Sequence, residues 1–432
     1  MKKVTGLLFA LSMLAPLASC GGNSQGDDFV PSLDTNRDCS ITVVGHYSNF
    51  QALEAEFGKF NVYYPNVKLS YLKLDNYKST LANKLDGDDK PNIFFSESLY
   101  IYDEEDGKKK YESIVSHMED LSDPSLKLDL SIIREGLLNR DTPNKLLLVP
   151  VFSRTYGMLV NEDIFKKEGL SIPKKWSELF TTCDSFIEKE YVSPMMGYSK
   201  GSSSCLMNTI AYPSFIADIA NNETAIELAN DLDVRAGEYT RDALTKVKEL
   251  IDEGCVNLSE CDKIGNNYDK VIFRFFEGDV PMMICTADTV SGTSSRESQS
   301  EAYSKNPFTY SFHPLPLNEL GGYFIDSPSL ELSVNKDCDN LDMTNEFMRF
   351  LLRPNELNAM AKAKGLITPV NGAKFDKVYA AFNDVASERT ICPQLIGVRD
   401  NLATQIRIAS YRVGKGEIDI DTAISSYGTF KD

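Results

Sequence analysis

Two short polar segments each follow an apolar, β-rich stretch, and their side chains could bind a small polar molecule. His46-Tyr47-Ser48-Asn49 follows residues 41–45, and Ser96-Glu97-Ser98 follows residues 91–95. Carboxylate, amide and imidazole groups form hydrogen bonds with hydroxyl or amino groups, and an aromatic face packs on apolar C–H groups. Both segments are therefore candidates for ligand binding.

The elements that would position both segments alternate between strand and helix. Strands are predicted at 41–45, 67–72 and 91–95, with helices over 49–60 and 77–85 between them. This order is typical of a parallel α/β sheet. Because right-handed crossovers bring the strand C-termini to one edge, we expect both polar segments at that edge.

The rest of the chain continues the α/β pattern. Apolar runs predict further strands at 146–151 and 280–285. Helical spacing predicts helices within 161–189, broken at Pro173, and over 241–253, 342–352 and 399–411.

Motifs of common enzyme classes are missing or misplaced. Ser70-Tyr71-Leu72-Lys73 has S-x-x-K spacing, but it falls in a predicted strand and the sequence has no K-T-G partner. G-x-x-x-x-G-K-[ST] does not occur, and Gly197-Tyr198-Ser199-Lys200-Gly201, which has G-x-S-x-G spacing, does not follow a predicted strand. Three histidines and no C-x-x-C leave little for a metal site. The sequence predicts no enzyme, no cofactor and no metal.

The composition and charge of the chain exclude some classes of binding partner. The 432 residues include 45 Lys+Arg and 63 Asp+Glu, a formal charge of −18. Such an acidic chain is unsuited to nucleic-acid phosphates or to electrostatic adhesion on anionic lipid. No run of about 18 apolar residues predicts a membrane-spanning helix.

The N-terminus is typical of an export signal. Basic residues at 2–3 precede an apolar run over 7–17, and Leu17-Ala18-Ser19-Cys20 resembles the bacterial lipobox. That resemblance predicts a signal peptide at 1–19 and acylation of Cys20, which would hold the protein on the extracytoplasmic face of a bacterial cell membrane. An ordinary secretory signal is the alternative. Residues 20–38 are small and polar, which favours a flexible tether.

Eight cysteines remain beyond Cys20. An even number in an exported chain permits disulfides, and Cys255 and Cys261, with five residues between them, are the best-spaced pair. Buried free thiols are the alternative.

Several segments, read in order, resemble the family 1 extracellular solute-binding proteins of ABC importers, the maltose-binding-like group. The strongest runs from Tyr156-Gly157-Met158-Leu159-Val160-Asn161-Glu162-Asp163-Ile164-Phe165 through Lys167-Glu168-Gly169-Leu170 to Ile172-Pro173-Lys174-Lys175-Trp176-Ser177-Glu178-Leu179. The others are the helix and Tyr-Pro at 50–65, Phe276-Glu277-Gly278-Asp279, the stretch from Leu330 to Gly365-Leu366-Ile367-Thr368-Pro369, and the closing helices after Ile391.

The resemblance implies an α/β fold with two lobes, each a mostly parallel sheet flanked by helices, and a ligand cleft between them. It predicts the first lobe from 39–151 and 286–328, and the second from 152–285 and 329–432. The chain would cross between lobes near Val151 to Thr155 and return near Thr286.

The same resemblance adds candidate binding residues to His46, Tyr47, Asn49, Ser96 and Glu97. They lie at the expected crossings, in the segment where the family often places a stacking aromatic residue, and after Gly321-Gly322. They are Phe152, Arg154, Tyr212, Thr286, Asp288, Tyr323 and Phe324.

The implied function is capture of a small polar solute, with carbohydrate favoured, and its delivery to ABC permease subunits by hinge closure of a monomer. The single tryptophan, Trp176, falls in a packing motif, so tyrosine or phenylalanine would have to stack on a sugar. A polyamine or an anionic solute remains an alternative ligand for the same receptor. A surface adhesin lipoprotein without a transport role is the alternative of another class.

Overall fold

The computed structural model describes residues 29–95, 114–138, 145–265 and 267–431. It divides the chain into two units, Met1–Val30 and Pro31–Asp432, and all the strands and helices below lie in the second. No described helix is long and apolar enough to cross a membrane.

The first sheet has five strands in the order β2-β1-β3-β12-β4. They are β1 (Cys39–Gly45), β2 (Val67–Lys73), β3 (Ile93–Phe95), β4 (Val149–Arg154) and β12 (Ser327–Val334). β1 runs parallel to β2 and β3, whereas β12 runs antiparallel to β3 and β4. The predicted strand–helix–strand–helix–strand start is therefore confirmed.

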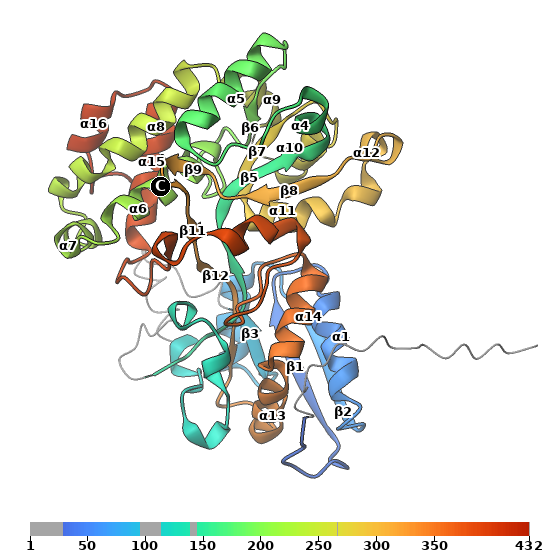
Figure 1. The fold of residues 1–432 in the computed structure, drawn as a ribbon. Coiled ribbons are helices and arrows are strands. Elements are labelled where there is room, and N and C mark those ends of the chain that lie inside the picture. The colour runs from blue at the N-terminus through green and yellow to red at the C-terminus, as the bar shows by residue number, and fades with distance from the viewer. Residues whose placement is uncertain (1–28, 96–113, 139–144, 266, 432) are drawn as a thin grey trace, which may run out of the picture. The chain divides into compact units, whose positions relative to one another are not determined.

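Four helices accompany the first sheet: α1 (Gln51–Phe60), α2 (Tyr77–Asp86), α13 (Leu341–Leu351) and α14 (Pro354–Lys364). The helical spacing of Leu53, Phe57 and Phe60 buries one face of α1. Phe57 and Phe60 lie with ring centroids 5.6 and 5.2 Å from that of Phe347 on α13. Figure 1 shows α1 and α14 side by side over the sheet. Short 3₁₀ turns follow at Pro124–Leu126, Leu130–Ile132 and Glu135–Leu137.

The second sheet has four strands in the order β6-β7-β5-β8. They are β5 (Tyr156–Asn161), β6 (Met195–Met196), β7 (Met282–Thr286) and β8 (Tyr310–His313). β5 runs antiparallel to both β7 and β8, and β6 runs parallel to β7. Two small sheets pair β9 (Pro316–Asn318) with β10 (Gly321–Gly322), and β11 (Phe324–Ile325) with β13 (Thr390–Ile391).

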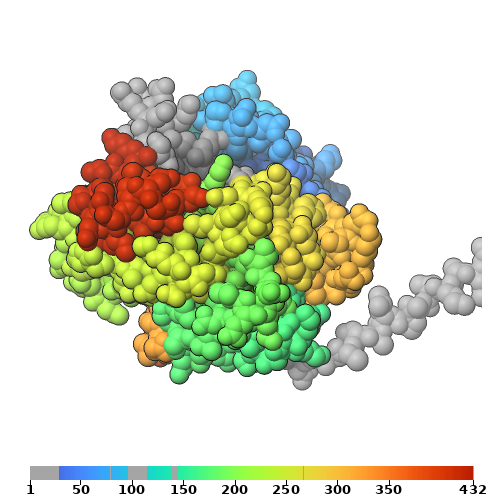
Figure 2. Space-filling model, turned by 90° about the horizontal axis from the view of Figure 1, so that it is seen from above, coloured from blue at the N-terminus to red at the C-terminus, as the bar shows by residue number. Residues whose placement is uncertain are grey.

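Most helices belong with the second sheet. They are α4 (Glu162–Glu168), α5 (Trp176–Glu188), α6 (Leu206–Ile219), α7 (Glu223–Asn230), α8 (Arg241–Asp252), α9 (Leu258–Ile264), α10 (Tyr268–Phe275), α11 (Ala287–Ser294), α12 (Glu301–Lys305), α15 (Asn401–Gly414) and α16 (Ile420–Ser425). α15 packs on α6 and α8, and Figure 2 shows the C-terminal segment in red against its yellow-green neighbours. Leu402 and Ile406 of α15 join the core around this sheet.

Three segments connect the two sheets. The first is Thr155, between β4 and β5, in agreement with the predicted crossing. The second lies between β8 and β12. The third runs from Ile367, which forms a β-bridge with Ser153 of β4, to the 3₁₀ segment Lys377–Asp384, which contacts β8.

The strand pairing differs from the predicted lobe boundaries. β8 lies in 286–328 but extends the second sheet, because the free edge of β5 accepts it. β12 lies in 329–432 for most of its length but fills the gap between β3 and β4 of the first sheet. The return near Thr286 is wrong for the same reason: α11 continues on the second sheet. Both sheets are mixed rather than mostly parallel, since the connecting strands run antiparallel to their neighbours.

Gly45, the last residue of β1, permits close packing beneath His46. A Cβ atom at this position would lie 2.3 Å from the Phe95 ring. We expect Gly45→Ala to lower the free energy of unfolding by about 1–3 kcal/mol through overpacking, as measured by urea denaturation. Gly58 is the matched control: it is exposed on α1 with nothing within 4 Å of its added Cβ. Gly58→Ala should stabilise by about 0.5–1 kcal/mol, and equal losses in both variants would contradict this account.

Candidate functional site

The first crossing brings polar residues from both sheets to one place. Arg154, the last residue of β4, pairs with Ser327 of β12, and Tyr156, the first residue of β5, pairs with Thr286 of β7. A single residue, Thr155, separates the two strands. Residues at these strand ends therefore meet where the sheets are joined.

Asp288, in the first turn of α11, links the two sheets. Its Oδ1 accepts a hydrogen bond of 2.8 Å from the Ser329 hydroxyl of β12. Its backbone carbonyl accepts one of 2.7 Å from the Tyr268 hydroxyl of α10. These contacts hold a half-buried carboxylate at the crossing.

Arg154 lies among acids and tyrosines. Desolvation by the surrounding protein lowers its pKa, but nearby Tyr156, Asp288 and Asp400 raise it, and the net shift is upward. Its side chain is nevertheless exposed to solvent. Arg154 is thus a solvent-exposed cation close to both acids and tyrosines.

Two tyrosines form an aromatic surface beside this cation. The ring centroids of Tyr156 and Tyr212 of α6 are 5.4 Å apart, with the planes tilted by 44°. Desolvation raises the pKa of both phenols, so both remain neutral donors and acceptors at neutral pH. Tyr156 is half-buried and Tyr212 is nearly covered.

A second cation lies over the aromatic side chain that follows β1. The ammonium of Lys364, at the end of α14, lies 4.3 Å from the ring centroid of Tyr47. Desolvation lowers the pKa of Lys364, while Asp288 raises it, so these charges lie close to one another. Tyr47 and Lys364 thus lie on the side of the crossing that also holds Asp288.

Two buried hydroxyls complete this site. Thr155 and Thr286 are 1% and 7% exposed, and neither Oγ1 has a hydrogen-bond partner within the described ranges. An unsatisfied buried hydroxyl costs free energy unless a ligand or water bonds to it. The site combines aromatic faces with charged and uncharged hydrogen-bonding groups, and can bind a polar molecule that also has apolar faces.

Residues 116–385 match the model of the bacterial extracellular solute-binding protein family, over more than half of the chain. The chain belongs to this family. A comparison with curated protein sequences gives no match.

Solved structures show that this solute-binding protein has the two-domain fold of the maltose-binding type. RafE in complex with raffinose is 17% identical, with 90% of this chain and 98% of that chain covered and a TM-score of 0.63. A Bacillus licheniformis sugar transporter in complex with stachyose is 15% identical (90% and 99% covered, TM-score 0.61). The GacH receptor of Streptomyces glaucescens, studied with acarbose, is 18% identical (90% and 97% covered, TM-score 0.62).

The site of this solute-binding protein contains five predicted candidates: Tyr47, Arg154, Tyr212, Thr286 and Asp288. His46 lies next to it, with its ring edge-on to those of Tyr47 and Phe95. Asn49 instead accepts a hydrogen bond from Gln51 at the start of α1 and is exposed. Ser96 and Glu97 lie outside the described residues.

Three candidates are placed elsewhere. Phe152 is fully buried against Phe50, because alternate residues of β4 point into the core. Phe324 is buried against Phe375 and Phe382, and Tyr323 is hydrogen-bonded by Asn318. The preceding glycines reflect close packing instead: a Cβ at Gly321 would meet the Arg389 guanidinium.

Sequence reasoning missed Tyr156, Ser329 and Lys364 as site residues. Tyr156 and Lys364 lie within segments that carry the family resemblance, and Tyr156 lies two residues after Arg154, a spacing that places both on one face of extended chain. Ser329 had no local signal, because only long-range pairing brings β12 to the crossing.

The predicted Cys255–Cys261 disulfide is absent, and both are buried free thiols. Cys261 lies on the buried face of α9. Cys255 instead contacts Cys183 of α5, where the neighbouring thiol and burial raise the pKa of Cys183. Trp176 packs on Phe180 and under Lys246, in agreement with its predicted structural role.

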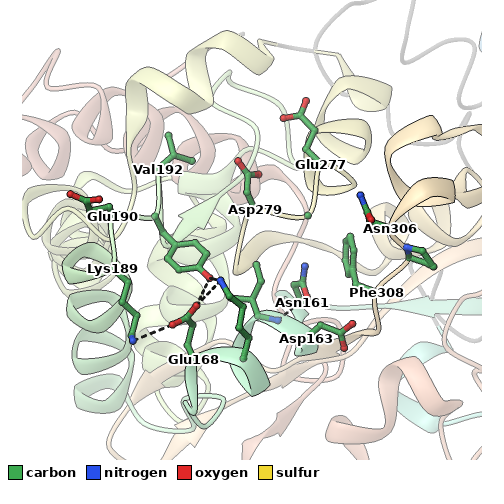
Figure 3. A pocket seen from close by; sticks show the side chains of 15 residues that line it. Asn161, Asp163, Glu168, Lys189, Glu190, Val192, Glu277, Asp279, Asn306 and Phe308 are labelled. Carbon is green, nitrogen blue, oxygen red and sulfur yellow. Dashed lines mark hydrogen bonds and ion pairs between the residues drawn. The ribbon is translucent and has the colours of Figure 1, made fainter.

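A cavity of about 920 Å³ lies at the end of β5 opposite Tyr156, beyond Asn161. Six residues of strand separate that end from Tyr156 by about 16 Å. Figure 3 shows Glu168 on the lining of this cavity, where it bonds to Lys189 at 3.1 Å and accepts a hydrogen bond of 2.9 Å from Tyr191. It is therefore separate from the site at the crossing.

Proposed function

We propose that this protein is the solute receptor of an ABC importer and that it binds a carbohydrate at the crossing site. The observation that carries this proposal is the meeting of Tyr156 and Tyr212 with Asp288, Ser329 and Arg154 at the connection between the sheets. Aromatic faces suit the C–H faces of a sugar ring, while the polar groups suit its hydroxyls.

The mechanism is reversible binding without chemistry. Because the site contains groups from both sheets, a bound ligand would stabilise the arrangement in which the two lobes close on it. The closed form would then be the one that the permease subunits recognise, and a monomer is sufficient for this. The sugar ligands named for RafE and for the Bacillus licheniformis protein support the same ligand class.

The alternatives fit less well. A polyamine is itself a cation, and Arg154 and Lys364, which both lie near Asp288, would repel it. A surface adhesin needs no recessed polar site, and the chain belongs to a solute-binding family.

The test is binding by a variant that lacks one aromatic face. Tyr156→Ala should weaken binding of any saccharide that raises the melting temperature of the wild-type protein by at least about 10-fold, because it removes stacking and apolar contact. A thermal-shift screen finds the ligand, and calorimetry gives the dissociation constant. Tyr191→Ala, at the distant cavity, is the control and should bind normally. Unchanged binding by Tyr156→Ala would contradict the placement of the site.

We also propose that Cys20, outside the described residues, carries the lipid anchor on the extracytoplasmic face of the membrane. Once residues 1–19 are removed, Cys20→Ser should move the exported protein from the membrane fraction to the soluble fraction, because an acidic surface does not adhere to anionic lipid. Immunoblots of the two fractions check this, with Cys39→Ser as the control. Retention of the Cys20→Ser protein on the membrane would contradict the anchor.

A further inference from the structure

Arg154 differs from most arginines that the structure describes. The chain has more acids than bases, and guanidiniums such as those of Arg134, Arg274 and Arg296 pair with Asp326, Asp279 and Asp269. The guanidinium of Arg154 makes no hydrogen bond or ion pair with any part of the chain that the structure describes. Its five N–H donors are therefore available to a ligand.

Lys364 is a second cation without a carboxylate partner in the described ranges. Its ammonium contacts the face of Tyr47 rather than an acid, and its side chain is half-buried. A cation–π contact leaves the N–H donors on the other side of the ammonium free. Two cations thus face the same site from β4 and α14.

The carboxylates at the site do not occupy the N–H donors of these cations. Asp288 is engaged by the Ser329 hydroxyl, and Asp400, at the start of α15, is exposed. Both influence Arg154 through space, without a hydrogen bond to it. A neutral sugar could offer only uncharged hydroxyl oxygens as acceptors for the Arg154 donors. A carboxylate would satisfy them in the bidentate geometry that a guanidinium favours.

We propose that the ligand is an acidic oligosaccharide, in which the carboxylate of a uronic acid accepts hydrogen bonds from Arg154 and lies near Lys364 while sugar rings pack on Tyr156 and Tyr212. This inference rests on the proposed function and adds the charge of the ligand. Asp288 and the hydroxyls of Thr155 and Thr286 then bind sugar hydroxyls.

The test uses ligand pairs that differ in charge and by one methyl group at each carboxyl. Trisaccharides of galacturonate, guluronate and glucuronate are each compared with their methyl esters, and maltotriose and raffinose are the neutral sugars. Calorimetry is done on wild type, Arg154→Gln, Arg154→Lys and the control Arg235→Gln, whose exposed guanidinium pairs with Asp233 away from the site. Unfolding curves of each variant without ligand show that it is folded.

We expect one acidic trisaccharide to bind at least 10-fold more tightly than its methyl ester. Arg154→Gln should weaken that binding by about 10- to 100-fold, the range for a hydrogen bond to a charged group, and remove the preference for the acid. Arg154→Lys should keep part of the preference, and Arg235→Gln all of it. Binding of neutral sugars or esters alone, or an acid preference that survives in Arg154→Gln, overturns this inference but leaves the carbohydrate receptor intact. Absence of binding by every saccharide overturns both.

Discussion

Replacing Arg134 by methionine is expected to destabilise the protein by about 3–5 kcal/mol, because it leaves a buried carboxylate unpaired. Arg134 donates to both oxygens of Asp326, at 2.6 and 3.0 Å, and to the carbonyl of Thr368 at 2.7 Å. The Ser153 hydroxyl donates to Asp326 at 2.6 Å. Ser153, Asp326 and Thr368 stand at the three crossings, so one guanidinium holds all three together. The midpoint of urea denaturation measures the effect.

A double variant distinguishes the effect of the lost ion pair on stability from the effect of the lost packing. The Arg134 guanidinium also lies 5.8 and 5.6 Å from the rings of Phe324 and Phe375, a contact that methionine partly replaces. Adding Asp326→Asn should therefore recover part of the loss, since no buried charge remains. Arg241→Met, at an exposed pair with Glu238, is the control and should change the midpoint little. A double variant less stable than Arg134→Met would contradict the account.

Stability should fall in acid through Glu346, a carboxylate on α13 with 3% of its side chain exposed. Burial raises its pKa, but hydrogen bonds from Arg349, Tyr64 and Ser32 outweigh burial and lower it to about 2 from 4.5. A depressed pKa contributes stability above 4.5 that is lost as pH falls toward 2. At about 1.4 kcal/mol per pKa unit, the contribution is about 3 kcal/mol.

Glu346→Gln isolates this contribution from that of other acids. The stability difference between wild type and Glu346→Gln should be largest near pH 7 and shrink steadily between pH 4.5 and 2, as measured by denaturation at each pH. Glu238→Gln, at an exposed pair, should give a nearly constant difference. A difference for Glu346→Gln that does not change with pH would show that the carboxylate is not depressed in the folded protein.

Local pattern predicted the elements that bury one clear face. β1, α1, β2, α2 and β3 form within two residues of their expected bounds, because apolar periodicity of 2.0 or 3.6 determines which face is buried. α6 had no such signal: it is buried on nearly all sides and contains Pro213. β8 and β12 were assigned to the wrong sheets, since pairing between strands distant in sequence leaves no periodic trace.

The candidate site was predictable only where strand ends meet a recognised motif. Arg154, Thr286 and Asp288 lie at crossing strands, and Tyr47 follows β1, so topology alone brings them together. Lys364 reaches the site from the end of α14, and no spacing in the sequence indicates that its ammonium lies over Tyr47. The glycines at 321–322 wrongly suggested a ligand loop, because a side chain at Gly321 would meet Arg389 rather than a ligand.

The contacts of Ser32 with Glu346 have a mechanical consequence. The Ser32 amide and hydroxyl donate to the two carboxylate oxygens at 2.8 and 2.7 Å, seven residues before β1 begins at Cys39. If the chain is anchored through Cys20, tension reaches this clamp, which lies within the predicted tether 20–38, before it reaches β1. The load passes through Glu346 into α13 and its packing on α1, and β1 is spared from being peeled out of the sheet. A receptor pulled by its own anchor would thus keep its first sheet intact.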